Sequence, residues 1–447
     1  MPLLRHLRPR DAAAFGRASR AARAFRLAPS GRPFMPTFEY HRQRVQEVDL
    51  ASVECMYADS AGFVTPSHTA EFAVCLSSCT SLKGLYCSNN PKLVVASLAP
   101  ALGGLTRLTT LDMSHSRLAI DDHRNFERPQ PLKPFFAALP PRLRILDLSH
   151  NHLRDEHVDL LTEALEAIYD ADADHTAPPS LEQLSLRSNY LGNGAGSALA
   201  ALLRGGRAGA ALWRLDLRTN AIDADGACAM LAALQYPTSM RELRIGYNKQ
   251  NAQQDLECAR LASIALRRAL SRTCGSRLEL LDLSNVRMGD AGAKQLAISL
   301  GLNDVLRRLD LAFNAIGPEG ARFLAQALET NQCLFELDLR DNEVGDEGAE
   351  VLAQGLQQNY SLRKLQLARN GVELRGAYAL MKATHNREDL TIDFGASGAG
   401  ELNPVQVRNM LGRTHSMASL SFVRAAERED RECRLAAQNN AMSMFVG

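Results

Sequence analysis

Three nine-residue stretches decide the fold: LRRLDLAFN at 306–314, LFELDLRDN at 334–342 and LRKLQLARN at 362–370. Each reads Leu-x-x-Leu-x-Leu-x-x-Asn, and the central leucines, Leu309, Leu337 and Leu365, are 28 residues apart. Leucines at alternate positions have the period of a half-buried strand. Each stretch therefore predicts a short β-strand that leads into a turn at the asparagine.

The same pattern extends in both directions along the chain. Its central apolar residues make twelve candidate strands: Val48, Leu85, Leu111, Leu146, Leu184, Leu215, Leu243, Leu281, Leu309, Leu337, Leu365 and Ile392. After each asparagine the apolar spacing becomes helical, as in the segment from Pro318 to Leu328, where a proline followed by an acid suits a helix start. Each repeat is therefore predicted to be a strand, a turn and an antiparallel helix.

The repeated asparagine has a predicted structural role, because its amide can hydrogen-bond the backbone of the turn from one repeat to the next. The asparagines at this position are Asn90, Asn151, Asn189, Asn220, Asn248, Asn314, Asn342 and Asn370. Ser116 and Val286 stand in their place in two repeats. We expect the asparagine ladder to be interrupted there.

These motifs resemble the leucine-rich repeat family, in its ribonuclease-inhibitor-like subclass, from about residue 45 to residue 394. The resemblance implies an α/β solenoid, a curved horseshoe with a parallel sheet inside and helices outside. The stack must bend because strands are spaced about 4.8 Å apart and helices are about 10 Å wide. We divide the chain into an N-terminal extension (1–44), a repeat domain (45–395) and a helical C-terminal cap or extension (396–447).

The repeat is stretched at 120–141, 166–180, 204–211 and 248–276. Insertions in repeat proteins often carry specific contacts. One insertion holds acidic residues and a histidine, which we interpret as a solvated loop rather than a cation site: Asp170, Asp172, Asp174 and His175. After residue 400 two helical stretches, 405–413 and about 417–438, predict a cap over the last repeat or a helix that binds a partner.

The first 34 residues differ from the rest, with eight arginines, no lysine and one acid, Asp11. This composition is typical of a mitochondrial transit peptide, and Phe15, Ala18, Ala22 and Phe25 have the spacing of an amphipathic helix. A disordered basic tail and a translation start at Met35 instead of Met1 are the alternatives. The transit peptide predicts a mitochondrial location, and a start at Met35 predicts a cytoplasmic one, with a cytoskeletal or flagellar assembly as an option.

Charge and cysteine content narrow the function classes. With 51 basic and 50 acidic residues the net charge is +1, so no overall field attracts nucleic acid, and we do not expect it to bind directly. No apolar run is long enough to insert into a membrane. The nine cysteines are odd in number and irregularly spaced, which favours reduced, mostly buried thiols. A zinc site at Cys55, Cys75, Cys79 and Cys87 is the disfavoured alternative.

The sequence contains no nucleotide-binding or zinc-protease motif, and we expect no cofactor, no small-molecule substrate and no catalytic residues. The glycine-rich segment 192–196 is interpreted as the start of a repeat helix rather than a phosphate loop. His115 and His150 occupy one position in neighbouring repeats, with Asp112 and Asp147 beside them, so a zinc site is conceivable. A solvated histidine pair over a routine aspartate column is the favoured interpretation.

The remaining signal is the predicted concave face, where Trp, Tyr and Arg are the residue types of interface hot spots. We predict that it binds a partner through Arg187, Trp213, Arg214, Arg218, Arg244, Tyr247, Phe313, Phe335 and Arg340. The only tryptophan, Trp213, is placed at the centre of this patch.

The predicted function is a non-enzymatic scaffold that docks a protein partner or serves as a subunit of a multiprotein assembly. Resemblance to Ran GTPase-activating proteins makes a GTPase activator the first alternative, although no arginine matches the catalytic motif and no acidic tail is present. An axonemal or cytoskeletal complex subunit is the second alternative. A ubiquitin-ligase substrate receptor is a third alternative, but the sequence shows no N-terminal F-box-like helical segment.

Overall fold

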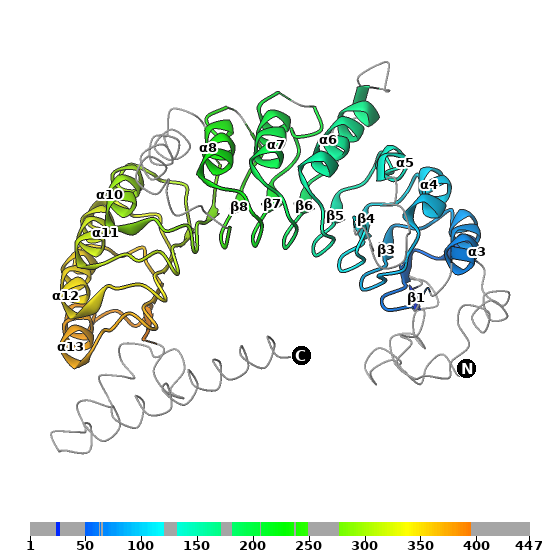
Figure 1. The fold of residues 1–447 in the computed structure, drawn as a ribbon. Helices are drawn as coiled ribbons and strands as arrows, with labels where there is room; N and C mark the ends of the chain where they lie inside the picture. Colours follow the sequence, from blue (N-terminus) through cyan, green and yellow to red (C-terminus); the bar gives the residue numbers. More distant parts are fainter. Residues whose placement is uncertain are drawn as a thin grey trace, which may run out of the picture. The chain divides into compact units, whose positions relative to one another are not determined.

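The computed structural model describes residues 24–26, 50–61, 63, 66–119, 132–170, 181–205, 207–236, 238–248 and 277–394. The chain forms two compact units, unit 1 (Met1–Leu243) and unit 2 (Arg244–Gly447). The division falls inside strand β8, Glu242–Arg244. In each unit the strands form a row with the helices along its outer side (Figure 1).

Unit 1 alternates three-residue strands with helices, after a short 3-10 helix at Leu50–Ser52. Its strands are β1 (Ala24–Arg26), β2 (Cys55–Tyr57), β3 (Gly84–Tyr86), β4 (Thr110–Asp112), β5 (Ile145–Asp147), β6 (Gln183–Ser185) and β7 (Arg214–Asp216). Its helices are α3 (Pro66–Ser77), α4 (Val95–Gly104), α5 (Leu132–Ala137), α6 (Asp155–Asp170), α7 (Asn193–Gly205) and α8 (Ala224–Ala233).

Unit 2 repeats the same alternation. Its strands are β9 (Leu280–Asp282), β10 (Arg308–Asp310), β11 (Glu336–Asp338), β12 (Lys364–Gln366) and β13 (Thr391–Asp393). Its helices are α10 (Gly289–Leu300), α11 (Pro318–Thr330), α12 (Gly345–Leu356) and α13 (Leu374–Ala383). Within each unit the strands pair in parallel and in chain order, which is the α/β solenoid that the repeat predicts.

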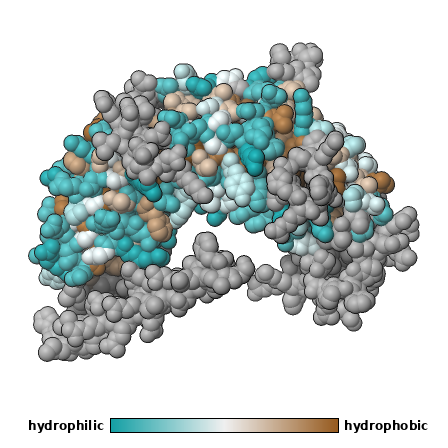
Figure 2. Space-filling model, in the orientation of Figure 1, coloured by the Kyte–Doolittle hydropathy of each residue, from teal (hydrophilic) through white to brown (hydrophobic). Residues whose placement is uncertain are grey.

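The strand register stacks the repeated leucines on one another. Leu309 pairs with Leu281 on one side and with Leu337 on the other, and all three are at most 1% exposed. Leu324 and Leu328 of α11 are buried beneath them. The core is thus a continuous leucine column shared between neighbouring repeats. On the face seen in Figure 2, hydrophobic residues lie in small groups among hydrophilic ones.

The asparagine ladder satisfies the backbone of each turn, and all eight predicted asparagines are buried. Asn342 Oδ1 accepts the N–H groups of Asn314 (2.9 Å) and Ile316 (3.0 Å) in the preceding repeat. Its Nδ2 donates to the carbonyl oxygens of Leu311 (3.0 Å) and Leu339 (2.8 Å). One side chain therefore pairs four backbone groups that burial would otherwise leave unsatisfied.

The predicted interruption at Ser116 is wrong. Its hydroxyl accepts from Asn90 N (3.3 Å) and donates to the carbonyl oxygen of Cys87 (3.2 Å), while its own N–H donates to Asn151 Oδ1 (2.8 Å). A serine hydroxyl can accept and donate at once, so it continues the ladder with a shorter side chain. Val286 has no such group and only donates its N–H to Asn314, so the ladder does lose a member there.

A second asparagine column, which the sequence pattern did not reveal to us, lies at the exits of the unit 2 helices. Asn303, Asn331 and Asn359 recur every 28 residues and are buried. Asn331 Nδ2 donates to the carbonyl oxygens of Leu300 (2.7 Å) and Asn303 (2.8 Å). Arg387 takes the next position, where its guanidinium donates to the carbonyl oxygens of Asn359 and Leu362. An arginine thus closes the column beside β13.

Helix starts are linked from repeat to repeat by an acid in the first turn. Asp290 Oδ1, at the start of α10, accepts the N–H groups of Gly317 (2.7 Å) and Gly320 (2.9 Å) at the start of α11. A Cβ on Gly320 would lie 2.5 Å from that oxygen, so the bond requires glycine. The small Gly-Ala pair of the repeat therefore serves the cap as well as close packing.

Two predictions at the N-terminal side need correction. The strand before Leu85 is centred on Met56, not on Val48, because Met56 pairs with Leu85 in the parallel register. Val48 lies outside the described residues. The predicted amphipathic helix does not reach Phe25, because Ala24–Arg26 forms β1 and pairs with β2. The rest of residues 1–44, the acidic loop after Asp170, the insertion 249–276 and residues 395–447 also lie outside the described part.

Candidate functional site

The turn after each strand places one side chain outward through a left-handed backbone. The residue just before each ladder residue, that is, before the asparagine or the residue that replaces it, has a left-handed backbone with φ between 52° and 60°. These residues are Asn89, His115, His150, Ser188, Thr219, Tyr247, Asn285, Phe313, Asp341 and Arg369. None is glycine, and each is exposed or half-buried. The repeat therefore holds these backbones in a conformation that costs a non-glycine residue about 1 kcal/mol or more.

In unit 2 two of these turn residues form an exposed aromatic pair. The rings of Tyr247 and Phe313 have centroids 5.6 Å apart and are inclined at 60°. They meet across the turn that carries Asn285, whose N–H donates to Ala312 O (2.7 Å). Tyr247 is 40% exposed and Phe313 is 38% exposed, so much of both rings faces solvent.

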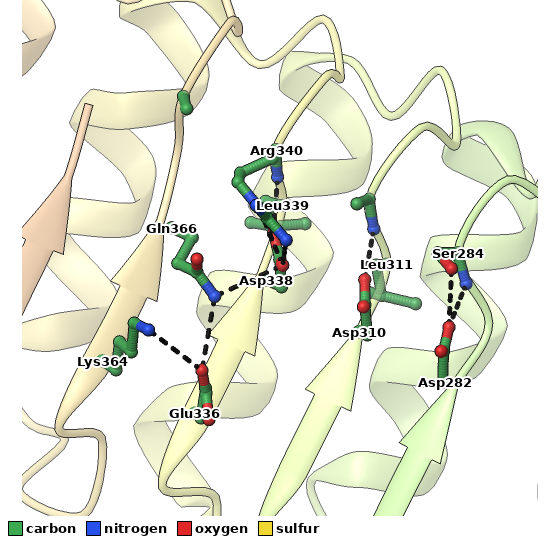
Figure 3. A network of polar contacts seen from close by, with 12 residues as sticks. Asp282, Ser284, Asp310, Leu311, Glu336, Asp338, Leu339, Arg340, Lys364 and Gln366 are labelled. Carbon is green, nitrogen blue, oxygen red and sulfur yellow. Dashed lines mark hydrogen bonds and ion pairs between the residues drawn. The ribbon is translucent and has the colours of Figure 1, made fainter. Parts of the chain in front are cut away.

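Beside this pair a column of aspartates follows the strands. Asp282, Asp310 and Asp338 stand on neighbouring strands, and their carboxylates project to the same side (Figure 3). Each Oδ1 accepts the N–H two residues later, as Asp310 does from Ala312 (3.0 Å). That bond closes the turn and explains why aspartate recurs between the strand leucines.

Asp310 is electrostatically unusual because it lies in the middle of this column. Burial, and then the carboxylates of Asp282 and Asp338, raise its pKa to about 7, and Arg340 opposes them only in part. Burial is the main cause that raises the pKa of Tyr247, and the negative charge of Asp310 is the second. The Asp310 carboxyl therefore lies close to the aromatic pair. The sequence predicts an aspartate column but not the raised pKa of Asp310, because that shift depends first on how deeply this carboxyl is buried.

Two predicted arginines are tied to their own strands. Arg340 Nε lies 3.0 and 2.9 Å from the two oxygens of Asp338, and its Nη2 is 2.6 Å from Oδ2. Arg218 binds Asp216 in the same two-pronged way, with Nη2 2.6 Å from Oδ2. Such pairs neutralise the guanidinium in a fixed geometry. Arg214 lies 3.4 Å from Glu242, and Arg244, on β8, is half-buried.

The predicted patch around Trp213 is not brought together. Trp213 lies just before β7, whereas Arg218 lies just after it and Arg187 just after β6. Trp213 and Arg218 are five positions apart along an extended segment, which separates their backbones by about 16 Å. Phe335 likewise precedes β11, at the opposite end of the strand from the turn that holds Phe313. Trp213 is half-buried and Phe335 is 49% exposed.

The alternative metal sites have no supporting geometry. No group of three or more candidate ligands gathers within the described ranges, which include the four cysteines and His115, His150, Asp112 and Asp147. The rings of His115 and His150 instead stack face to face, 3.8 Å apart and 12° from parallel.

Two of the six described cysteines, Cys79 and Cys87, are buried, and four are half-buried. Burial raises the pKa of Cys79 to about 12, with a further contribution from Cys75, so its thiol stays protonated at neutral pH. The prediction of mostly buried thiols therefore holds for only part of the set.

The glycine-rich start of α7 is already occupied by a side chain of the protein. Asp155 accepts the N–H groups of Gly192 (2.5 Å) and Gly194 (3.0 Å) through its two carboxylate oxygens. These are the donors that a phosphate would need. Among the helices of the described ranges, none is both long and apolar enough to cross a bilayer.

Comparison with known proteins identifies the repeat. A family model described as leucine-rich repeat matches residues 141–156, 303–325, 330–353 and 358–381. The chain is 38% identical over 128 residues to a Tonsoku-like protein of Danio rerio, covering 28% of this chain and 8% of that protein. It is 32% identical over 152 residues to a Tonsoku-like protein of Mus musculus, covering 33% of this chain and 10% of that one. The matched segments thus span a tenth or less of these relatives.

Among solved structures, an internalin of Listeria monocytogenes is similar with a TM-score of 0.40 and 20% identity, covering 72% of this chain and 76% of the internalin. The matched motif and the recurring strand, turn and helix lead to one conclusion. This chain is a leucine-rich repeat protein.

Proposed function

We propose that the protein is a non-enzymatic scaffold that docks a protein partner on the strand-and-turn face of unit 2. Leucine-rich repeats suggest protein–protein interaction as the general role. The observation that supports this particular surface is the exposed pair Tyr247 and Phe313, two large rings held on rigid turns. Large side chains with little rotational freedom are typical anchors of interfaces.

The surroundings of the pair favour burial under a partner. Arg340 is already neutralised by Asp338, and Gln366 lies 3.3 Å from the same carboxylate. Glu336 is flanked by Arg308 (3.7 Å) and Lys364 (3.5 Å), as Figure 3 shows in part. Covering these paired side chains strips less water from isolated charges, which is the costly step in polar interfaces. The Asp310 carboxyl beside the pair has a pKa raised to about 7, which lowers the cost of burying it in its neutral form.

The Tonsoku-like relatives do not indicate which protein is the partner, because the matched segment is a small part of each relative's length. A subunit role in a larger assembly stays part of the proposal. The composition of residues 1–34 supports a mitochondrial location as a further proposal, with a cytoplasmic or cytoskeletal one as its alternative.

The proposal is tested by affinity purification of the tagged full chain and of a Phe313→Ala variant, with mass spectrometry of the captured proteins. Loss of one anchor ring costs about 1 kcal/mol or more, so partner recovery should fall by about fivefold. Tyr378→Ala is the matched control, because Tyr378 is 59% exposed but lies on helix α13. Equal recovery of every partner by all three proteins would refute the proposed surface.

A further inference from the structure

Three consecutive turns of unit 1 carry a row of basic side chains, which we call the basic rim: His115, Arg117, His150, His152 and Arg187. His115 and His150 share the left-handed position before the ladder, and Arg117 and His152 share the position after it. The turns are fixed to each other, since His115 N donates to Ser149 O and His150 N to Arg187 O, both at 2.9 Å. The row is therefore a rigid feature of the solenoid.

The two arginines of the rim differ from the other arginines of the strand face. Within the described residues neither Arg117 nor Arg187 has an ion-pair partner, whereas Arg218 and Arg340 are clamped by aspartates. Both rim arginines are exposed. A guanidinium that is not neutralised within its own chain keeps its donors free for an external anion.

The pKa values of His150 and His152 are both lowered, in part by the positive charges around them. Burial lowers the pKa of His150 most, followed by the positive charges of His115 and Arg187, while Asp147 raises it less. His152 also lowers the pKa of His150. Burial and then Arg117 lower the pKa of His152. The cations of the rim thus outweigh the carboxylate at the end of β5.

The carboxylates nearest the rim are engaged in their own turns. Asp112 Oδ1 accepts the N–H of Ser114 and Asp147 Oδ1 that of Ser149, both at 2.9 Å. Both lie on the strands β4 and β5 rather than on the turns, and both are half-buried. They do not pair with the rim arginines.

We propose that the basic rim is a second binding surface, which takes a run of acidic side chains from a protein partner. Adjacent turns are spaced by about 4.8 Å, so the three turns span about 10 Å, and carboxylates on one side of an extended segment repeat about every 7 Å. Two or three carboxylates therefore match the row. Arg187 and Arg117 would each take one in a fork, and the imidazole N–H groups would share another.

An acidic peptide fits the rim better than a nucleic acid does. Five basic side chains, of which two are arginines, fall short of the roughly 6–10 phosphate contacts of nucleic-acid binders. Among the described residues, the rim contacts the aromatic ring of Tyr190, which is 5.2 Å from the ring of His152 and tilted by 46°. The stacked rings of Tyr57 and Tyr86 belong to strands β2 and β3, outside the rim. The three described turns of the rim therefore carry no row of tyrosine, phenylalanine or tryptophan platforms.

Binding should take up a proton. Two imidazolium rings 3.8 Å apart repel each other, so the free protein disfavours charging both His115 and His150. A bound carboxylate offsets that repulsion and so favours a charged imidazole on His150, whose pKa burial and then His115 lower in the free protein. Because the bound state then holds more protons than the free state, affinity rises as pH falls through the histidine range, about 7.5 to 6.

The test is fluorescence anisotropy of the full chain with labelled hexaglutamate, hexalysine and an oligothymidylate. Hexaglutamate should bind about threefold or more tightly at pH about 6 than at about 7.5, and hexalysine should not bind. Arg187→Gln should weaken the binding of hexaglutamate by about fivefold or more. Arg322→Gln, at an exposed arginine of α11, is the matched control.

A second variant separates binding from folding. Asparagine tolerates the left-handed backbone of this position, so His150→Asn should leave the circular dichroism spectrum unchanged. The pH dependence of hexaglutamate binding should become weaker, because one of the three rim histidines is removed. The proposal is overturned if hexaglutamate fails to bind at pH about 6, if Arg187→Gln and Arg322→Gln bind equally, or if oligothymidylate binds more tightly through Arg187. None of these residues belongs to the aromatic pair of unit 2, so the outcome is independent of the proposed function.

Discussion

Replacing Asp310 by asparagine should stabilise the protein at alkaline pH and leave it nearly unchanged at acid pH. The pKa of Asp310 is raised from 3.8 to about 7 by burial and by the carboxylates of Asp282 and Asp338. Since the folded pKa exceeds the unfolded one, the folded chain holds the proton more strongly between these values. Stability due to this group is therefore present at low pH and lost as pH rises from about 4 to about 7.

The magnitude follows from the size of the shift. A shift of about 3 units at about 1.36 kcal/mol each gives about 4 kcal/mol as an upper bound. Asp310 is not fully buried, so solvent screening reduces this, and we expect a difference of about 1–2 kcal/mol between variant and wild type above pH 8. An asparagine Oδ1 can still accept from Ala312 N, so the turn is kept.

Urea unfolding of both proteins at pH about 4.5 and about 8.5 measures this difference through the midpoint. Asp147→Asn is the control for the turn, because Asp147 holds the same position on β5 and its Oδ1 accepts the corresponding N–H, that of Ser149. Asp147 has one carboxylate neighbour, Asp112 on β4, with Ser185 on β6, whereas Asp310 has carboxylates on both sides. A gap between Asp310→Asn and wild type that is the same at both pH values would show that Asp310 is ionised throughout, and the reasoning would be refuted.

Three further predictions concern the backbone network. Asn314→Ala should lower the free energy of unfolding by about 1–3 kcal/mol, measured by urea titration, because it leaves buried turn groups unpaired. Ser116→Ala should cost about 1 kcal/mol in the same assay, and an unchanged midpoint would restore the idea of an interrupted ladder. Asp290→Ala should cost about 0.5–2 kcal/mol and speed amide hydrogen exchange at Gly317 and Gly320, whose N–H groups it caps.

The sequence was sufficient to predict the repeating architecture, because one leucine period and one helical period recur with little noise. It was weaker where a position is filled by an unusual residue. Met56 replaces leucine at the first well-defined repeat, and Ser116 replaces asparagine. Both positions depart from the motif, although Met56 still pairs in register and Ser116 still hydrogen-bonds the turn. A hydroxyl with a donor and an acceptor would have been the signal for Ser116.

The structure separates Trp213 from Arg187 and Arg218 for a different reason. Outward positions were grouped by distance from the leucines, without asking at which end of the strand each one lies. A three-residue strand has two ends, and Trp213 lies at the opposite end from Arg187 and Arg218. Strand direction follows from the sequence once the repeat is recognised, so the separation of Trp213 from the two arginines could have been predicted. Trp213 as a binding residue stays a prediction.

The contact between Tyr247 and Phe313, by contrast, could not be read from the sequence. The two residues are 66 positions apart, and the insertion 249–276 hides how many repeats separate them. Only the register of β9 and β10 shows that a single turn, that of Asn285, lies between them. Because asparagine is short, two large rings can meet above it; an arginine or tyrosine there would keep them apart. The identity of a binding surface in such a solenoid therefore depends on triplets of turn residues, whereas the fold depends on the leucines, and the two can change independently.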